Sequence, residues 1–217
     1  MVCDIRNARA VDWEDMCSFR NADQPWLLIG DIGDHQAKRT KKKSPCALYL
    51  LREPKWSAKD KTETDWNLRI EYEDGPHNCE GVAVDVELPE ILLLTKETPV
   101  IDGLYRLPLN LKDRKQKLTA KRIASLPLGF ATGRDISPDG RTLIGITMQD
   151  GWVCSRKADQ SWGDALTTSI RRFLVPQRRQ GQAVCFSADR KYLLLNSEKK
   201  RQPLWRLDCG KVLAGVE

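Results

Sequence analysis

The chain has 217 residues, of which 41% are apolar, and its 36 Lys and Arg against 30 Asp and Glu give a formal net charge of +6. The pI is about 8.9 and the mean hydropathy is −0.51. This length and composition are those of one folded domain and exclude an intrinsically disordered chain. No stretch approaches the roughly 20 apolar residues of a membrane-spanning helix. The first residues, MVCDIRNARAVDWED, lack the basic start and apolar middle of an export signal, so the chain as written is expected to stay in the cytoplasm.

The cysteine pattern excludes two common kinds of small domain. Seven cysteines are spread along the chain at positions 3, 17, 46, 79, 154, 185 and 209. They form no C-x-x-C pair and no metal-type spacing with the two histidines, His35 and His77, so we expect neither a disulfide framework nor a zinc finger. Cys17, Cys79 and Cys185 lie in or beside apolar runs and are expected to be buried.

Short apolar runs between Gly, Pro, Asp and Asn clusters predict many short strands rather than helices. Four segments have similar sequences: VDWEDMCSF (11–19), NCEGVAVDV (78–86), TGRDISPDG (132–140) and QGQAVCFSA (180–188). Each is followed by further runs, in chain order PWLLIGD, CALYLLREP and WNLRIEYED; EILLLTKE, GLYRLPL and LTAKRIASL; RTLIGITMQ, GWVCSRK and SIRRFLVP; and KYLLLNSE and PLWRLD. The chain therefore reads as one four-stranded antiparallel unit repeated four times.

The spacing of these units predicts an all-β fold of the β-propeller type. When Glu14, Glu80, Arg134 and Gln182 are taken as equivalent, the intervals are 66, 54 and 48 residues, close to the length of propeller blades. We place the blades at about 11–74, 78–127, 132–175 and 180–209 within a single domain, 1–217. A two-sheet sandwich is the rival, but it would not need the same motif in the first strand of every unit. Most tryptophans are expected to pack between blades: Trp13, Trp26, Trp66, Trp152 and Trp205.

Ring closure leaves two alternatives open, because the fourth unit has only three clear strands. The amino-terminal segment 2–8, VCDIRNA, could supply the missing outer strand and close a four-bladed ring. It could instead be the remaining edge strand of an earlier blade. We prefer the second, because the chain begins abruptly in strand-like sequence.

At VDWED, GDIGDH, HNCEG, TGRDISPDG and QGQAVCFSAD, the chain resembles a bacterial β-propeller group related to the phytase-like and esterase-like propellers. The resemblance covers nearly the whole chain. It implies one more amino-terminal blade in intact relatives, which would then have five, and an export signal in many of them. It also implies a calcium ion in the central channel of some relatives.

Two residues depart from the pattern of that group. Gln182 replaces the Glu of QGEA, and His35 replaces the Asn of GDIGDN. The first change weakens a metal site built from acids, since an amide oxygen can bind Ca²⁺ but brings no charge. The remaining acids that begin the first strands are our candidate metal ligands: Glu14, Asp15, Glu80 and Asp135. Such acids could equally cap strand ends by accepting backbone amides.

In a four-stranded meander, the loop before the first strand and the loop after the second lie on the same edge of the blade. Glu14, Glu80 and His77 are the candidate catalytic residues of this edge, with a carboxylate or His77 as base. Basic and amide side chains on the same edge are candidates for binding an anion: Lys38, Arg39, Lys96, Arg134, Arg179, Gln182 and Lys199. Lys38 to Lys43, KRTKKK, is the densest run of positive charge.

Two functions fit these residues. The first is a binding protein whose basic loop face takes an anionic small molecule, a carbohydrate or a protein. The second is a calcium-dependent hydrolase of a phosphoester, ester or lactone. A channel filled by side chains with apolar residues on its rim would favour binding, and an open pocket with clustered carboxylates would favour catalysis. No nucleic-acid-binding motif is present, and we expect a monomer.

Overall fold

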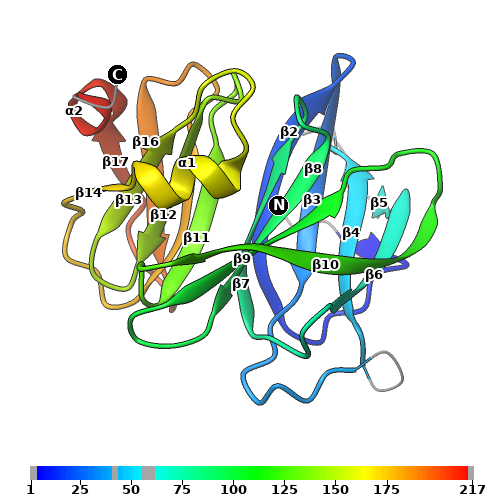
Figure 1. The fold of residues 1–217 in the computed structure, drawn as a ribbon. Coiled ribbons are helices and arrows are strands. Elements are labelled where there is room, and N and C mark those ends of the chain that lie inside the picture. The colour runs from blue at the N-terminus through cyan, green and yellow to red at the C-terminus, as the bar shows by residue number, and fades with distance from the viewer. Residues whose placement is uncertain (1–3, 41–43, 55–61, 215–217) are drawn as a thin grey trace.

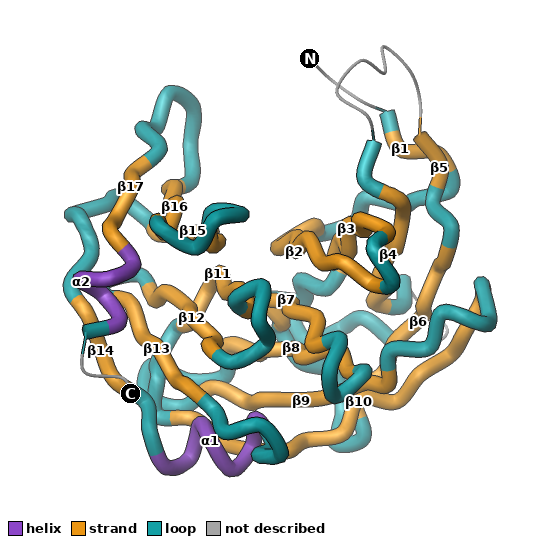
Figure 2. Tube along the Cα trace, turned by 90° about the horizontal axis from the view of Figure 1, so that it is seen from above, coloured by secondary structure: helices purple, strands orange, loops and turns teal. Residues whose placement is uncertain are grey.

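The computed structural model describes residues 4–40, 44–54 and 62–214. It is built almost entirely of strands, with two short helices, α1 (Trp162–Thr168) and α2 (Cys209–Leu213). The strands form four groups around a central space, with β2, β7, β11 and β15 innermost (Figures 1 and 2). The predicted all-β propeller fold is confirmed. The two helices were not expected from the sequence.

Each group is an antiparallel sheet whose strands follow one another from the inside to the outside. Sheet 1 contains β2 (Trp13–Asn21), β3 (Gln24–Asp31), β4 (Cys46–Arg52) and β6 (Trp66–Tyr72). Sheet 2 contains β7 (Cys79–Asp85), β8 (Glu90–Lys96), β9 (Asp102–Pro108) and β10 (Lys115–Leu126). Sheet 3 contains β11 (Ala131–Ile136), β12 (Thr142–Thr147), β13 (Gly151–Ser155) and β14 (Arg171–Phe173). Sheet 4 contains β15 (Gly181–Phe186), β16 (Tyr192–Ser197) and β17 (Trp205–Asp208).

Sheets 1 and 2 are joined through their outer strands. β10 has 12 residues, and its first half pairs in parallel with β6, from Lys115 opposite Asn67 to Ala120 opposite Tyr72. Its second half pairs antiparallel with β9, with a shift of register between Arg122 and Ala124. The two sheets therefore form one continuous eight-stranded sheet, which the repeat analysis had treated as two separate blades.

The amino-terminal segment does not close the ring. β1 (Ile5–Arg6) pairs in parallel with β5 (Thr62–Glu63), beside sheet 1, and in the described part of the chain no strand pairing joins sheet 4 to sheet 1. Ile5 and Ala8 instead pack on Ile29 and Tyr49, on the face of sheet 1 that is turned away from sheet 2. The described residues do not follow the alternative in which segment 2–8 completes the fourth unit, because Ile5 and Ala8 cover the outer face of sheet 1. The preferred alternative, an edge strand of an earlier blade, stays a prediction. Residues 2 and 3 lie outside the described part.

Three apolar cores fill the spaces between consecutive sheets. Alternate side chains of a strand point to opposite faces, so an apolar run such as β8 serves two cores at once. Leu93 of β8 packs toward sheet 1, whereas Leu92 and Leu94 pack toward sheet 3. Phe186 of β15 belongs to the third core, between sheets 3 and 4. Trp26, Trp66, Trp152 and Trp205 lie in or against these cores, as expected, but Trp13 is 41% exposed.

The four innermost strands begin at one edge of the molecule, which we call the loop face, and end at the opposite edge, which we call the hairpin face. In Figure 1 the loop face is the lower edge and the hairpin face is the upper edge. Cys17 and Cys79 are buried as expected, but Cys185 of β15 is exposed. Of the helices described, neither is long and apolar enough to cross a membrane.

A buried ion pair fixes the segment that carries α1 to sheet 2. Arg156 donates to Asp85 at 2.9 Å, and both side chains are fully buried. The indole Nε1 of Trp162 donates to the same Asp85 oxygen at 2.7 Å. Removing one partner of a buried pair leaves an uncompensated charge, whereas an exposed pair contributes little.

We therefore expect Arg156→Met to lower the free energy of unfolding by about 3–5 kcal/mol. The matched control is Arg6→Met, which breaks the exposed Arg6–Glu63 pair and should cost less than about 1 kcal/mol. Urea unfolding followed by circular dichroism measures both. Equal losses for the two variants would contradict the role assigned to the Asp85–Arg156 pair.

Candidate functional site

The structure brings Glu14 and Glu80 together where the central space opens on the loop face. Glu80, near the start of β7, accepts a hydrogen bond from Asn78 Nδ2 at 2.7 Å and lies 3.4 Å from Lys96 Nζ. Glu14, near the start of β2, lies beside Gly33, where a Cβ would come within 2.4 Å of Glu14 Oε1. Gly33 therefore leaves room for the Glu14 side chain.

The surroundings of Glu14 disfavour its charged form. Burial, together with the nearby acids Glu80 and Asp12, raises the pKa of Glu14 to about 8, while Lys96 opposes them. A carboxyl group with this pKa is mostly protonated at neutral pH. We call Asp12, Glu14, Glu80 and Lys96 the mouth cluster. It combines a protonated acid, a carboxylate held by an amide and an ammonium group.

Asp15 and Asp135 are used differently, because each connects two innermost strands. Asp15 accepts the backbone amides of Met16 and Val82, both at 2.9 Å, so it bridges β2 and β7. Asp135 accepts the amides of Ile136 and Phe186, also at 2.9 Å, and so bridges β11 and β15. Burial raises the pKa of both carboxyl groups to about 7. Asp15 and Asp135 thus follow the second expectation from the sequence, that these acids accept backbone amides rather than bind a metal.

The space between β7 and β11 is filled by Arg134. Its guanidinium group donates to the carbonyl oxygens of Gly81 and Leu92, and the side chain is 1% exposed. Burial lowers its pKa to about 10. Gly81 is required because a Cβ there would lie 2.7 Å from the carbonyl oxygen of Thr132. Arg134 therefore holds the sheets together and is not available to bind an anion on the surface.

The four carboxyl groups expected as calcium ligands do not form one ligand set. Glu14 and Glu80 face the mouth, whereas both oxygens of Asp15 and of Asp135 already accept backbone amides. Within the described ranges, no group of three or more His, Cys, Asp and Glu side chains is arranged to hold a metal ion. Calcium binding stays a prediction, without the four-carboxylate arrangement on which it was based.

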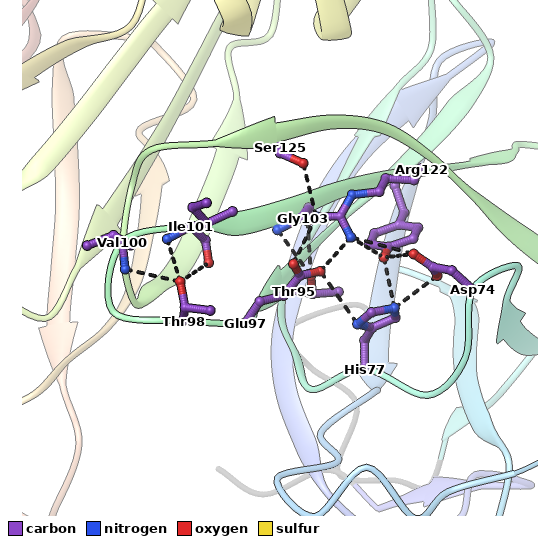
Figure 3. Close-up of polar contacts among 11 residues, drawn as sticks. Asp74, His77, Thr95, Glu97, Thr98, Val100, Ile101, Gly103, Arg122 and Ser125 are labelled. Carbon is purple, nitrogen blue, oxygen red and sulfur yellow. Dashed lines mark hydrogen bonds and ion pairs between the residues drawn. The ribbon is translucent and has the colours of Figure 1, made fainter.

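His77 belongs to a separate network on the loop face (Figure 3). Its Nε2 lies 2.9 Å from Asp74 Oδ1 and 2.8 Å from the hydroxyl oxygen of Tyr105, and its Nδ1 lies 3.5 Å from Glu97. Arg122 donates to both oxygens of Glu97, at 2.9 and 2.8 Å. Because both ring nitrogens face carboxylates, His77 is held in place as a donor and is poorly suited to act as a free base.

Sequence reasoning missed the partners of His77. Asp74 lies three residues before it in the same loop, a spacing that could have suggested the pair. Tyr105 and Arg122 come from β9 and β10, and nothing in their local sequence indicates that they meet His77. The Tyr105 hydroxyl donates to Asp74 at 2.7 Å and accepts from Arg122 at 2.9 Å, so the network is fully bonded internally.

The basic residues expected to bind an anion fall into two groups. Arg39 is tied into its own loop by Asp31 and by the carbonyl oxygens of Gly33, Ser44 and Pro45, and Lys96 pairs with Glu80. Lys38, Arg179 and Lys199 are exposed on the loop face, and Gln182 is half-buried in β15. Lys41, Lys42 and Lys43 of the densest basic run lie outside the described residues.

Apolar side chains are also exposed on the loop face. Nine large hydrophobic residues are exposed in the described part of the chain, and seven of them lie in loops or strand ends of this face. They are Val11, Trp13, Val100, Ile101, Met148, Leu174 and Leu204. Leu174 is 92% exposed and Leu204 is 67% exposed. A concentration of exposed apolar residues on one face is typical of an interaction surface.

We expect the acids of this region to make the protein less stable as the pH rises. The folded-state pKa of Glu14, about 8, lies above its usual 4.5, so the folded protein holds this proton more tightly than the unfolded chain. Stability is then highest below about pH 4.5 for this group and falls as the pH rises through about 8. Glu14→Gln should reduce that fall by about 1 kcal/mol, after allowance for solvent screening.

Urea unfolding at pH 5 and pH 8 in the presence of EDTA measures this effect. Asp23→Asn, in the exposed turn between β2 and β3, is the matched control. If wild type and Glu14→Gln lose the same stability between the two pH values, the assignment of a protonated Glu14 is wrong.

Comparisons with known proteins support the fold. No protein family profile matches the sequence, and no curated protein is similar to it. A gluconolactonase from Xanthomonas campestris has a similar structure, with a TM-score of 0.52 and 13% identity over 96% of this chain and 60% of that one. A candidate 6-phosphogluconolactonase from Bacteroides uniformis gives a TM-score of 0.50 and 9% identity over 88% of this chain and 66% of that one.

This chain thus spans less than two thirds of the length of either protein. At these identities the likeness establishes the fold alone, since one fold carries many functions. The narrower relation to phytase-like and esterase-like propellers, and an additional amino-terminal blade, stay predictions. The chain has a β-propeller fold similar to that of the gluconolactonase.

Proposed function

We propose that this protein is a binding protein whose loop face takes an acidic, partly apolar segment of another protein. The observation that carries the proposal is that seven of the nine exposed large hydrophobic residues in the described part share the loop face with exposed cations. The centre of the molecule, between β7 and β11, is filled by Arg134. Apolar residues on the rim and a filled centre are the features expected of a binding protein.

The richest part of this surface lies on sheet 4. Its two loops carry Leu174, Arg179, Lys199, Lys200, Arg201 and Leu204, all exposed, which we call the rim patch. The loops lie side by side, because Glu198 N donates to Gln180 O at 3.0 Å and Ser197 Oγ donates to the same oxygen at 2.6 Å. In the described ranges, Arg179, Lys200 and Arg201 have no ion-pair partner.

The chemistry of the rim patch favours a protein partner. Unpaired cations attract carboxylates and speed the encounter with an acidic partner. Exposed leucines add apolar area that an acidic peptide with Leu or Phe side chains can cover. Single-stranded nucleic acids are bound mainly on aromatic side chains, and the rim patch has none.

Charge reversal of the rim patch should strongly weaken binding of such a peptide. The probe is a fluorescent synthetic peptide in which Glu alternates with Leu and Phe, and its anisotropy reports binding at low and high salt. The triple variant Lys199→Glu, Lys200→Glu, Arg201→Glu should weaken binding at least about tenfold, the effect of about 1.4 kcal/mol. Leu204→Ser should weaken it less.

Lys112→Glu, on an exposed loop of the hairpin face, is the control for the change in net charge. A peptide of Glu and Gly alone separates simple charge attraction from the proposed recognition. If the two peptides bind equally, or if Lys112→Glu weakens binding as much as the triple variant, the proposed recognition is wrong.

A second candidate function, hydrolysis of a lactone, is favoured by the mouth cluster. Glu80 accepts from Asn78 and pairs with Lys96, and Glu14 has a pKa of about 8. In this scheme Glu80 takes a proton from water as it attacks the lactone carbonyl, and Lys96 stabilises the oxyanion. Glu14 then protonates the ring oxygen as the C–O bond breaks. Two acids with different protonation states are the pattern of acid–base catalysis.

Hydrolysis of glucono-1,5-lactone, followed with a pH indicator in EDTA and in added Ca²⁺, tests this candidate. If it holds, Glu80→Gln and Glu14→Gln should each lower the enzymatic rate about 100-fold or more. Folding of both variants is checked by circular dichroism. A wild-type rate no higher than that of buffer, under both conditions, would reject the candidate.

A further inference from the structure

A cavity opens on the hairpin face, opposite the mouth cluster. Its volume is about 350 Å³, and all four innermost strands contribute to its wall. Phe19 comes from β2, Val84 from β7, Asp135 from β11 and Phe186 from β15. The cavity is thus the other end of the central space, where sequence reasoning placed only hairpin turns.

The wall of this cavity combines apolar and polar side chains. Phe19, Val84, Ile136 and Phe186 form its apolar part, together with Pro25 of β3 and Pro138 of a turn, and serines lie among the polar residues. Phe186 and Val84 are otherwise buried in the cores between sheets, so their positions are fixed by packing. A preformed apolar wall of this size fits the ring or short hydrocarbon body of a small ligand.

Asp135 presents to the cavity a carboxyl group that has no cationic partner among the described residues. Each of its oxygens accepts one backbone amide and keeps a second acceptor position, and burial and the nearby acid Asp15 raise its pKa. Asp85, also on the wall, is already neutralised by Arg156. Arg20 lies at the exposed rim, where it donates to Asp23 O at 3.1 Å, and Glu53 is exposed at the same rim.

We propose that this cavity binds a small organic cation, an ammonium group on an apolar or aromatic body. The ammonium group would supply the counter-charge that Asp135 lacks, and the aromatic faces of Phe19 and Phe186 add cation–π attraction. The apolar body would cover the remaining wall. This site is independent of the rim patch and of the mouth cluster, since it lies on the opposite face.

Three probes that share one ring but differ in charge test the proposal by isothermal titration calorimetry. 2-Phenylethylammonium should bind, while phenylacetate and 2-phenylethanol should bind at least about tenfold more weakly, the scale of one charge-assisted hydrogen bond. Binding of phenylacetate as tight as that of the ammonium probe would overturn the proposal, because Arg20 would then decide the specificity.

Two variants locate the binding to this cavity. Asp135→Asn keeps the shape of the side chain and should weaken 2-phenylethylammonium about tenfold. Arg20→Gln removes a cation of the rim, the one found there among the described residues, and should tighten binding about two- to threefold, the effect of an exposed charge. Because Arg20 is exposed, this variant is expected to fold even if Asp135→Asn does not. Lys112→Gln is the surface control, and an affinity unchanged by Arg20→Gln and by a folded Asp135→Asn would place the binding elsewhere.

Discussion

Sheets 1, 2 and 3 each have two apolar faces, and the arrangement of the chain follows from the need to cover both. Consecutive sheets cover each other's apolar faces, so that three apolar cores lie between the four sheets. At the centre, Asp15 and Asp135 connect neighbouring innermost strands by accepting backbone amides. Arg134 makes the equivalent connection between β7 and β11 by donating to the carbonyl oxygen of Gly81, which has no side chain in the way.

The two ends of the central space differ because the same strands carry different residues at their beginnings and ends. The beginnings of β2 and β7 bring Glu14 and Glu80 to the loop face, and the end of β8 brings Lys96 beside them. Strand ends bring Phe19 and Phe186 to the hairpin face, around one unpaired acid. Arg134 and Asp15 lie between these ends. Ligands of different chemistry are therefore favoured at the two openings.

Much of the fold could be predicted from the sequence because a propeller repeats its own pattern. The four similar segments correspond to β2, β7, β11 and β15, and the apolar runs after them correspond to the following strands. The parallel pairing of β6 with β10 could not be predicted, since it depends on where two outer strands meet in space. Segment 2–8 has the composition of a strand, yet its contacts with Ile29 and Tyr49 are decided by the uncovered face of sheet 1.

Part of the candidate site could also be predicted from the sequence repeat. The proximity of Glu14 and Glu80 follows from their equivalent positions in the repeat, but the repeat says nothing about which oxygen is already bonded. Asp15 and Asp135 occupy equivalent positions too, and only the geometry of the neighbouring amides shows that they connect strands. His77 is bonded instead to Tyr105, which lies 28 positions farther along the chain and is itself bonded to Arg122.

The parallel pairing of β6 with β10 also bears on how the molecule comes apart. Sheets 1 and 2 share one uninterrupted hydrogen-bond ladder, whereas sheets 3 and 4 have ladders of their own and contact their neighbours through side chains. Amide protons from β2 to β10 should accordingly exchange with solvent through a common opening event. Those of β15 to β17, with one sheet neighbour and three strands, belong to a unit that opens earlier. Sheets 1 and 2 then form a large rigid half, and sheets 3 and 4 can open while that half stays folded.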